Sequence, residues 1–287
     1  MTKEPLHVSS DVVGLYSGVQ QFNVSFRDVS NFAAAIGDNN PRYFDSLNAC
    51  AHPIFPVTMS WQILQHRDNV WAKRFSLEIR NRMVHYDEHI EFNKNITTGD
   101  VLTANSQIIG MEKHKLGTKI QLKISYQTEK GEEVITEYVS SILFGVTCDE
   151  DKVVEKSPID INNSDRHDSM MWEESINIDK TAPYMYDGCT GISAPIHTDE
   201  NYARSIGLPG IIYHGTATLA RSVTAIINKE LGGDASRVKS ISSKFTGKLT
   251  IPNTLHVNLI AHENKHISFL TNDKSGQSIL AGNLTIR

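Results

Sequence analysis

The stretch that decides the fold reads "TGISAPIHTDENYA" and covers residues 190–203. A closely related stretch, "IGDNNPRYFDSLNACA", occurs earlier, at residues 36–51. Gly191 in the later copy matches Gly37 in the earlier one, 154 residues before it. Because self-similarity at a fixed offset is the signature of a repeated structural unit, the chain is expected to contain the same unit twice.

The match extends beyond these two stretches and runs through most of each half. Further matched pairs, at offsets of 153 to 156 residues, are Pro41 with Pro195, Asp45 with Asp199, Ala49 with Ala203, Pro53 with Pro209, Phe92 with Phe245 and Leu102 with Leu255. Offsets that drift by a residue or two are what loop insertions produce. The sequence therefore predicts an N-terminal domain over residues 1–148, a polar linker over 149–168 and a similar C-terminal domain over 169–287.

Each half is predicted to place a helix directly before the motif. In "SFRDVSNFAAAIG" (25–37), apolar residues recur at helical spacing, Ser25 and Asp28 are start signals, and Gly37 is a stop signal. The corresponding segment of the second half is residues 179–191. Both copies of the motif are therefore expected to begin where a helix ends.

A second helix and a set of strands are predicted after each motif. The helix is long over residues 214–233 and shorter over 56–66. Residues 118–145 and 254–286 alternate apolar and polar side chains between turn signals, which is typical of antiparallel strands. Strands that follow a helix in this way predict an α+β domain, a sheet curved around one central helix. Two such domains could pair their sheet edges and form one continuous sheet.

Composition excludes several classes of protein. The chain has 287 residues and a formal net charge of -5, whereas nucleic-acid binders normally carry a basic face. No apolar run approaches the roughly 18 residues of a membrane span. The start of the chain lacks the apolar stretch of a signal peptide. Three cysteines (Cys50, Cys148 and Cys189) stand at no metal-like spacing, so a reduced, cytoplasmic protein is expected.

Several stretches carry a resemblance to a known family. They are "TGISAPIHTDENYARSIGLPGIIYHGTATLA" (190–220), "AIGDNNPRYFD" (35–45), "AHPIFPV" (51–57), "VHYDEHIEF" (84–92) and "ITTGDVL" (96–102). The first resembles the hydratase motif of MaoC-like proteins, the (R)-specific enoyl-CoA hydratases and 3-hydroxyacyl-thioester dehydratases. The others resemble the N-terminal half of the family's two-domain members. The resemblance implies a double hot-dog fold, which is two tandem hot-dog domains.

The resemblance also implies roles for individual residues. His197 takes the position of the family's acid–base histidine, and the N–H of Gly215, just after His214, that of the donor to the thioester oxygen. A helix N-terminus suits a developing oxyanion because its free N–H groups and its dipole both favour negative charge. The family's acid position holds Ile192 in this half, whereas the first copy supplies Asp38. Asp38 and His197 are therefore the expected catalytic pair, provided that the two loops meet.

Other residues are weaker candidates. Tyr43 stands at the histidine position of the first copy and Asn40 at its asparagine position, and both are expected substrate contacts together with His214. Asp187, one helical turn before the second motif, is an alternative acid. His85 lies at the start of a predicted strand and is interpreted as structural. No spacing of cysteine and histidine resembles a metal site.

The function implied by the resemblance is reversible addition of water to an enoyl thioester of CoA or of an acyl carrier protein, within fatty acid metabolism. Neither a cofactor nor a metal is expected, because the thioester itself acidifies its Cα proton. One alternative is an inactive thioester-binding or assembly protein of the same fold, with Ile192 marking the loss of activity. A thioesterase is a weaker alternative. Acyl chain length and self-association into a homo-oligomer are left open.

Overall fold

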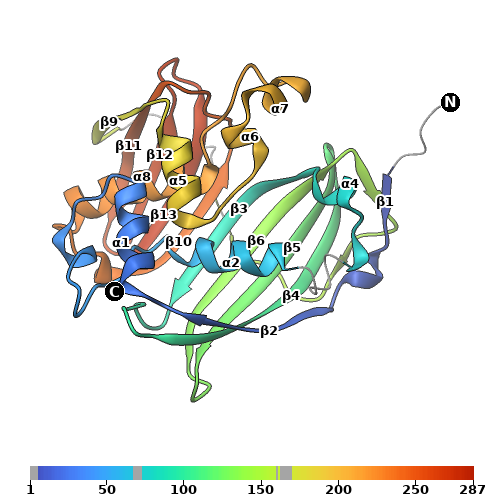
Figure 1. Cartoon of the computed structure of the whole chain (residues 1–287), viewed down its shortest axis with the longest axis horizontal. Helices are drawn as coiled ribbons and strands as arrows, with labels where there is room; N and C mark the ends of the chain where they lie inside the picture. Colours follow the sequence, from blue (N-terminus) through green and yellow to red (C-terminus); the bar gives the residue numbers. More distant parts are fainter. Residues whose placement is uncertain (1–5, 67–72, 160, 162–169) are drawn as a thin grey trace.

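The computed structural model describes residues 6–66, 73–159, 161 and 170–287. One eleven-stranded sheet, to which both halves of the chain contribute, forms its centre (Figure 1). A separate two-stranded sheet pairs β1 (Leu6–Val8) with β7 (Val146–Cys148) in parallel. Within the predicted linker, β8 (Lys152–Val153) pairs with strand β4, whereas residues 160 and 162–169 lie outside the described residues. The domain boundaries therefore stay a prediction.

The strands of the two halves follow the same spatial order. The first half contributes β2 (Tyr16–Asn23), β3 (Met83–Phe92), β4 (Val101–His114), β5 (Gly117–Thr128) and β6 (Glu133–Phe144). The second contributes β9 (Trp172–Ile178), β10 (Val238–Phe245), β11 (Asn253–Glu263), β12 (His266–Asn272) and β13 (Ser278–Ile286). From the outer edge inward, the orders are β2-β4-β5-β6-β3 and β9-β11-β12-β13-β10. The repeat in the sequence is thus a repeat in topology, and the predicted double hot-dog fold is confirmed.

The two halves join along β3 and β10, which pair antiparallel in the middle of the large sheet. Their register places His89 opposite Ser242, and the histidine Nδ1 lies 2.6 Å from the serine hydroxyl. The next pair, Ile90 and Ile241, is fully buried. His89 and Ser242 are separated by 153 residues, the same offset that relates Phe92 to Phe245. The predicted continuous sheet therefore forms around a local pseudo-twofold axis.

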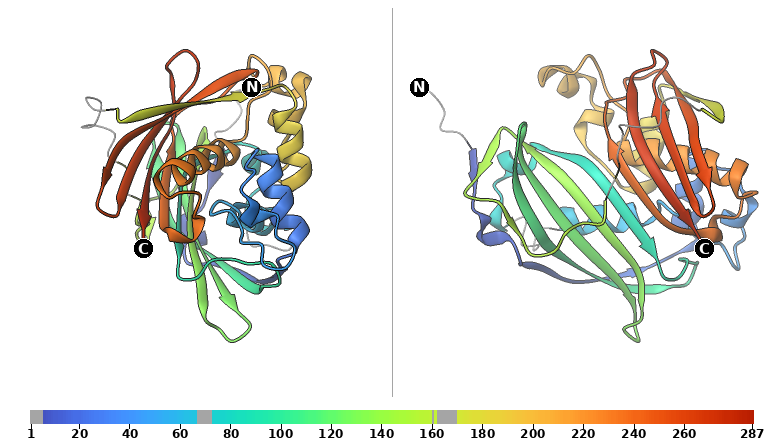
Figure 2. Two further views of the ribbon diagram at one scale, coloured as in Figure 1. Left: turned by 90° about the vertical axis from the view of Figure 1, so that its left-hand side faces the viewer. Right: turned by 180° about the vertical axis from the view of Figure 1, so that it is seen from behind.

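Helices cover one side of this sheet. The first half supplies α1 (Phe26–Ala35), α2 (Pro56–Gln65) and α4 (Leu77–Arg80), and the second supplies α5 (Ala182–Thr190), α6 (Pro195–Thr198), α7 (Glu200–Ser205) and α8 (Gly215–Glu230). Short 3-10 turns lie at Ser10–Val12, Pro41–Tyr43 and Ala235–Arg237. The left panel of Figure 2 shows α8 between the strands of the second half and the neighbouring helices α1 and α5.

Helix α8 is the centre of the core because both of its sides are covered. Leu219, Val223 and Ile226 are fully buried on the apolar stripe, and Ala217 and Ala220 are fully buried on the opposite side. Fully burying a large aliphatic side chain is worth about 1.5–3 kcal/mol. The small alanines let the neighbouring elements approach the helix backbone closely. This packing fixes the position of the α8 N-terminus, on which the site depends.

Local sequence signals explain where the helices before the motifs begin and end. Ser25 and Asp28 form a capping box at the start of α1, as the sequence predicts. Gly37 and Gly191 follow α1 and α5 with φ of 71° and 70°, a left-handed conformation that favours glycine. Both motifs therefore leave their helices by the same turn. No helix within the described ranges is long and apolar enough to cross a membrane.

Candidate active site

A cavity of about 310 Å³ lies between the two halves of the chain. Its first-half wall comes from α2, β3 and β6, and its second-half wall from residues 192–197 and the first turn of α8. Titratable side chains on the walls include His85, Glu88, His197 and His214. The second copy of the motif thus faces the first half of the chain across a shared space. Ile192, at the motif's acid position, also lines this space.

His197 lies on α6, which begins at Pro195. Its Nδ1 is 2.9 Å from the carbonyl oxygen of Ile212. Because a carbonyl only accepts, Nδ1 carries the proton and Nε2 is left as an acceptor. Burial lowers the pKa of His197, while the hydrogen bond to Ile212 and the charge of Asp187 oppose this shift. The ring is therefore neutral near pH 7, which suits a general base.

His214 supports His197 from behind. The two rings stack with centroids 3.8 Å apart and planes 24° apart. Nε2 of His214 donates to the carbonyl oxygen of Ile192 at 3.0 Å. Burial first and the neighbouring His197 second lower the pKa of His214 to about 2, so this ring stays neutral. His214 lines the cavity, and its geometry is that of a residue that positions His197; its expected contact with substrate stays a prediction.

The N-terminus of α8 opens onto the same cavity at Gly215. No described side chain caps this helix, so its first N–H groups are available to a ligand. A Cβ on Gly215 would lie 3.2 Å from Cδ1 and Cε1 of Phe245, closer than most real contacts. A side chain at this position would therefore require the Phe245 ring to shift by a few tenths of an ångström. The geometry agrees with the predicted position of an oxyanion donor.

Asp38 lies outside this cavity. It is buried, and its carboxylate accepts from the Thr224 hydroxyl at 2.9 Å and from the N–H of Asn40 at 3.0 Å. Thr224 follows Gly215 by nine residues on α8, about 13 Å along the axis at 1.5 Å per residue. The structure therefore does not bring Asp38 to His197, and the expected composite pair is corrected. Burial raises the pKa of Asp38, with the two hydrogen bonds opposing the shift.

Asn40 and Tyr43 also lie away from the cavity. The Asn40 amide donates to the carbonyl oxygen of Gly233 at 2.6 Å, and its Oδ1 accepts from the N–H of Arg42 at 3.1 Å. Tyr43 is fully buried, and burial strongly raises the pKa of its hydroxyl. Together with Asp38, these residues hold the first copy of the motif against α8 and the loop that follows it. The expectation that Asn40 and Tyr43 contact substrate in this cavity is therefore also corrected.

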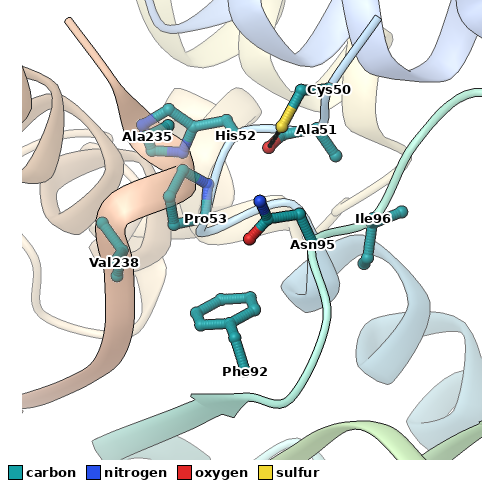
Figure 3. Close-up of a pocket in the computed structure, with 9 residues that line it drawn as sticks. All are labelled: Cys50, Ala51, His52, Pro53, Phe92, Asn95, Ile96, Ala235 and Val238. Carbon is teal, nitrogen blue, oxygen red and sulfur yellow. Dashed lines mark hydrogen bonds between the residues drawn. The ribbon is translucent and has the colours of Figure 1, made fainter. Parts of the chain in front are cut away.

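A smaller cavity lies near the first copy of the motif, and Figure 3 shows the side chains around it. His52, Asn95 and Phe92 are among its lining residues. Its volume is about 10 Å³, room for about one water molecule. Burial lowers the pKa of His52 to about 3, and its Nε2 lies 3.2 Å from the Thr224 hydroxyl. This cavity is too small for an acyl group, so the larger one is the candidate site.

Sequence reasoning did not assign two titratable side chains of the larger cavity. His85 was interpreted as structural and Glu88 was not considered, yet both line the cavity and their side chains approach to 2.8 Å. Glu88 is 1% exposed, which for an unpaired carboxylate would be costly. A glutamate within a predicted strand was the signal in the sequence that could have identified Glu88. Among the described residues, no group of three or more histidine, cysteine, aspartate or glutamate side chains could hold a metal ion.

Comparison with known families agrees with this geometry. Residues 164–281 match the model of the MaoC like domain, and residues 11–137 match that of the FAS1-like, dehydratase domain region. Each half of the chain thus matches a dehydratase-type domain model, and the whole chain has the double hot-dog fold of MaoC-like proteins. The cavity lies where these two matched regions face each other.

Individual relatives show how far the similarity extends. The peroxisomal enoyl-CoA hydratase 2 of Arabidopsis thaliana is 33% identical over 94 residues, which cover 32% of this chain and only 30% of that enzyme. The MaoC-like dehydratase of Phytophthora capsici is 19% identical, with a TM-score of 0.83 and 96% of each chain covered. The peroxisomal multifunctional enzyme type 2 of Drosophila melanogaster is 17% identical, with a TM-score of 0.78; the similarity covers 95% of this chain and 48% of that one.

Proposed function

We propose that the protein is a hydratase or dehydratase that adds water reversibly to the double bond of an enoyl thioester. The observation that carries this proposal is the position of His197. Its ring lines a cavity between the halves, beside the uncapped N-terminus of α8 at Gly215. The matches to dehydratase domain models and to an enoyl-CoA hydratase support the same reaction class.

The chemistry follows from this arrangement. The thioester oxygen accepts a hydrogen bond from the N–H of Gly215, which stabilises the negative charge that develops there. Nε2 of His197 takes a proton from a water molecule, whose oxygen attacks Cβ of the double bond. Cα must then receive a proton from a second group. Stacking on His214 and the bond to Ile212 hold the His197 ring in the required tautomer.

The acyl group is proposed to be carried by CoA or by an acyl carrier protein, and the reaction to belong to fatty acid metabolism. Both carriers present the same thioester to the cavity, so one chemistry serves either. A cytoplasmic location and self-association also stay predictions from the sequence. Since the thioester provides the electron sink, the proposed reaction requires no redox group.

One observation favours a second candidate function. Ile192 occupies the motif position where the family has its acid, and its side chain is 6% exposed. An inactive protein that binds acyl thioesters without converting them would show this substitution. A thioesterase of the same fold, in which water attacks the thioester carbonyl instead of Cβ, is a weaker alternative.

A single set of assays separates the three functions. Purified protein is incubated with crotonyl-CoA and longer enoyl-CoAs, and the loss of the enoyl absorbance is followed. We expect turnover, and His197→Gln is expected to reduce kcat by about 10²- to 10⁴-fold, the usual contribution of an acid–base group. Release of free thiol would instead indicate a thioesterase. Saturable binding of butyryl-CoA, with no turnover of any enoyl thioester, would indicate the inactive protein and refute the proposal.

A further inference from the structure

The first half of the chain presents a histidine and a glutamate to the cavity from strand β3. Nε2 of His85 lies 2.8 Å from Oε2 of Glu88. The His85 side chain is 28% exposed, whereas that of Glu88 is 1% exposed. His85 is therefore the member whose ring borders the cavity, whereas its Nε2 is buried against Glu88, which lies behind it. The His85 ring also packs against Phe245, with centroids 4.6 Å apart, beside the α8 entry.

A β-bulge brings these two side chains to the same face of the sheet. Side chains three residues apart on a regular strand point to opposite faces. Here, however, the register of β3 with β6 shifts at Tyr86: His85 is opposite Ser141, whereas Glu88 is opposite Val139. Ser141 and Val139 are two residues apart, so they share a face, and both line the cavity. The bulge therefore turns both His85 and Glu88 towards the cavity. Bulges are common next to active sites, where they redirect side chains in this way.

Glu88 is the inner end of a buried chain of protonatable groups. Its carboxyl lies close enough to that of Glu137 for each to affect the pKa of the other, and Glu137 accepts from the Tyr126 hydroxyl at 2.6 Å. Glu137 and Tyr126 are fully buried. Burial is the largest cause that raises the pKa of Glu88, to about 8, and that of Glu137 well above its usual range. The chain therefore holds at least one proton near neutral pH, and it reaches the cavity at His85.

Hydration of an enoyl thioester needs two proton-transfer groups, and the second half of the chain supplies only one. We propose that the His85–Glu88 pair is the second acid–base group of the site, in place of the motif acid that is Ile192 here. His85 would be the catalytic residue that touches the substrate, and Glu88 the residue that positions it and supplies the proton. Burial lowers the pKa of His85 to about 4, so its ring is neutral near pH 7 and the protonated member of the pair is Glu88. This inference rests on the proposed hydratase function and specifies which residues of the site carry it.

The other two acids are poorer candidates. Asp38 is bonded to Thr224 on the far part of α8. Asp187 is close enough for its charge to act on His197, and its Oδ2 is buried without a partner. It precedes the motif on α5, however, and it is not among the residues that line the cavity. Among the described residues that line the cavity, only the His85–Glu88 pair combines a carboxyl group with a ring that borders it.

The proposed step balances in atoms and charge. Water gives its hydroxyl to Cβ and its proton to Nε2 of His197. The electron pair of the double bond moves towards the thioester, whose oxygen is held by the N–H of Gly215. The His85–Glu88 pair gives one proton to Cα, which re-forms the thioester carbonyl. The proton on His197 returns to the pair through the cavity when the product leaves, so the protein ends as it began.

The first test compares two histidines of the same strand. His85→Asn is expected to lower kcat for crotonyl-CoA hydration by about 10²- to 10⁴-fold, while the affinity for unreactive butyryl-CoA stays within about threefold. His89→Asn is the matched control, because His89 is also buried on β3 but bonds Ser242 at the seam instead of lining the cavity. Asp187→Asn tests the rival acid. Unchanged kcat in His85→Asn, or a loss confined to Asp187→Asn, would overturn the inference.

Rescue keeps the test informative if His85→Asn is poorly folded. Adding Ile192→Asp to His85→Asn restores a carboxyl group at the motif position, and kcat is expected to rise by about tenfold or more over the single variant. A misfolded protein would not regain activity by this route, whereas lack of rescue in a folded double variant contradicts the inference. If the unmodified protein converts no enoyl thioester, the proposed function itself fails. If the unmodified protein does convert an enoyl thioester and His85→Asn has the same kcat, the proposed function stands and only the role of the His85–Glu88 pair is refuted.

The pH profile distinguishes positioning from mere packing at Glu88. Titratable groups around the pair are Asp87, Glu137, Tyr126 and Tyr186, with His197 and His214 also lining the cavity. A protonated Glu88 predicts that kcat falls above about pH 8, and Glu88→Gln is expected to remove this alkaline limb as well as lower the plateau. A variant that lost stability alone would keep the shape of the profile. An alkaline limb unchanged in Glu88→Gln would contradict the assigned role.

Discussion

Replacement of Gly215 by proline should remove the proposed oxyanion donor without breaking the helix. Gly215 is the first residue of α8, a position that proline favours because its N–H would make no helical bond. The preceding residue, His214, has φ of -61° and ψ of 134°, the extended conformation that a residue before proline adopts. The substitution therefore removes one N–H group from the cavity and leaves the remaining helical hydrogen bonds in place.

The expected magnitude follows from the loss of that single donor. Removing one oxyanion donor typically lowers kcat by about 10²- to 10³-fold, or about 2.7–4 kcal/mol. Steric effects have to be separated, because any Cβ at this position meets the Phe245 ring at 3.2 Å. Gly215→Ala carries the same Cβ but keeps its N–H, so it is the matched control. The ratio of kcat between the alanine and proline variants then measures the combined effect of two changes. One is the loss of the N–H donor, and the other is the space near the thioester oxygen that the proline ring fills.

The assay is crotonyl-CoA hydration by both variants, with denaturant unfolding as a measure of stability. Restriction of the unfolded chain by proline is worth about 0.4–1 kcal/mol of stability where the native conformation suits it. The contact with Phe245 opposes this gain equally in both variants, so Gly215→Pro should be at least as stable as Gly215→Ala. Equal kcat in the two folded variants would refute the role of the Gly215 N–H and would move the oxyanion site away from this helix.

Three further outcomes test the site and its surroundings. The acidic limb of the pH–kcat profile should lie below pH 6.5, because burial lowers the pKa of His197; a limb above pH 7 would contradict a buried neutral base. Thr224→Val should cost about 1–3 kcal/mol in urea unfolding while kcat stays unchanged, since it takes a donor from buried Asp38; a large loss of kcat would return Asp38 to the active site. Burial raises the pKa of Glu88 from 4.5 to about 8 in the folded protein. Its contribution to the free energy of unfolding should therefore be complete below about pH 4.5 and should be lost as the pH rises through about 8. Glu88→Gln should flatten the pH dependence of stability across that window, and an equally steep curve would exclude Glu88 as its source.

The sequence predicted the architecture well because its signals are local and occur twice. Capping at Ser25 and the left-handed turns at Gly37 and Gly191 follow from the residues themselves. Pairing of one sheet edge from each half was predicted only as the economical way to close two open edges, and the structure shows that β3 and β10 are the strands that pair. The offset between the repeats also relates these two strands to each other. Phe92 and Phe245, which match in the sequence, are the last residues of β3 and β10, the strands along which the halves join.

The site was predicted in part, and the errors have physical causes. His197 and Gly215 lie together because one chain segment carries both. Whether Asp38 joins them depends on how the pseudo-twofold axis orients the two loops, which no local pattern encodes. The axis sends the first motif to the far part of α8, where Thr224 satisfies Asp38. His85 was missed for another reason: alternation places it and Glu88 on opposite faces, and only the bulge at Tyr86 reverses that.

The duplication offers a way for the proposed site to work with Ile192 at the acid position of its own motif. In a pseudo-twofold dimer each cavity has walls from both halves, so a group absent from one wall can be supplied by the other. The first motif is no longer free to act, because Asn40 and Asp38 bond Gly233 and Thr224 and tie the halves together. Strand β3 is the first-half strand at the seam, so a bulge there changes the cavity wall while the pairing of His89 with Ser242 holds the register. The half that carries Ile192 at the motif's acid position thus faces the His85–Glu88 pair across the cavity. If that pair is the second acid–base group, as proposed, the two copies divide the proton transfers between them, which accounts for both departures from the motif.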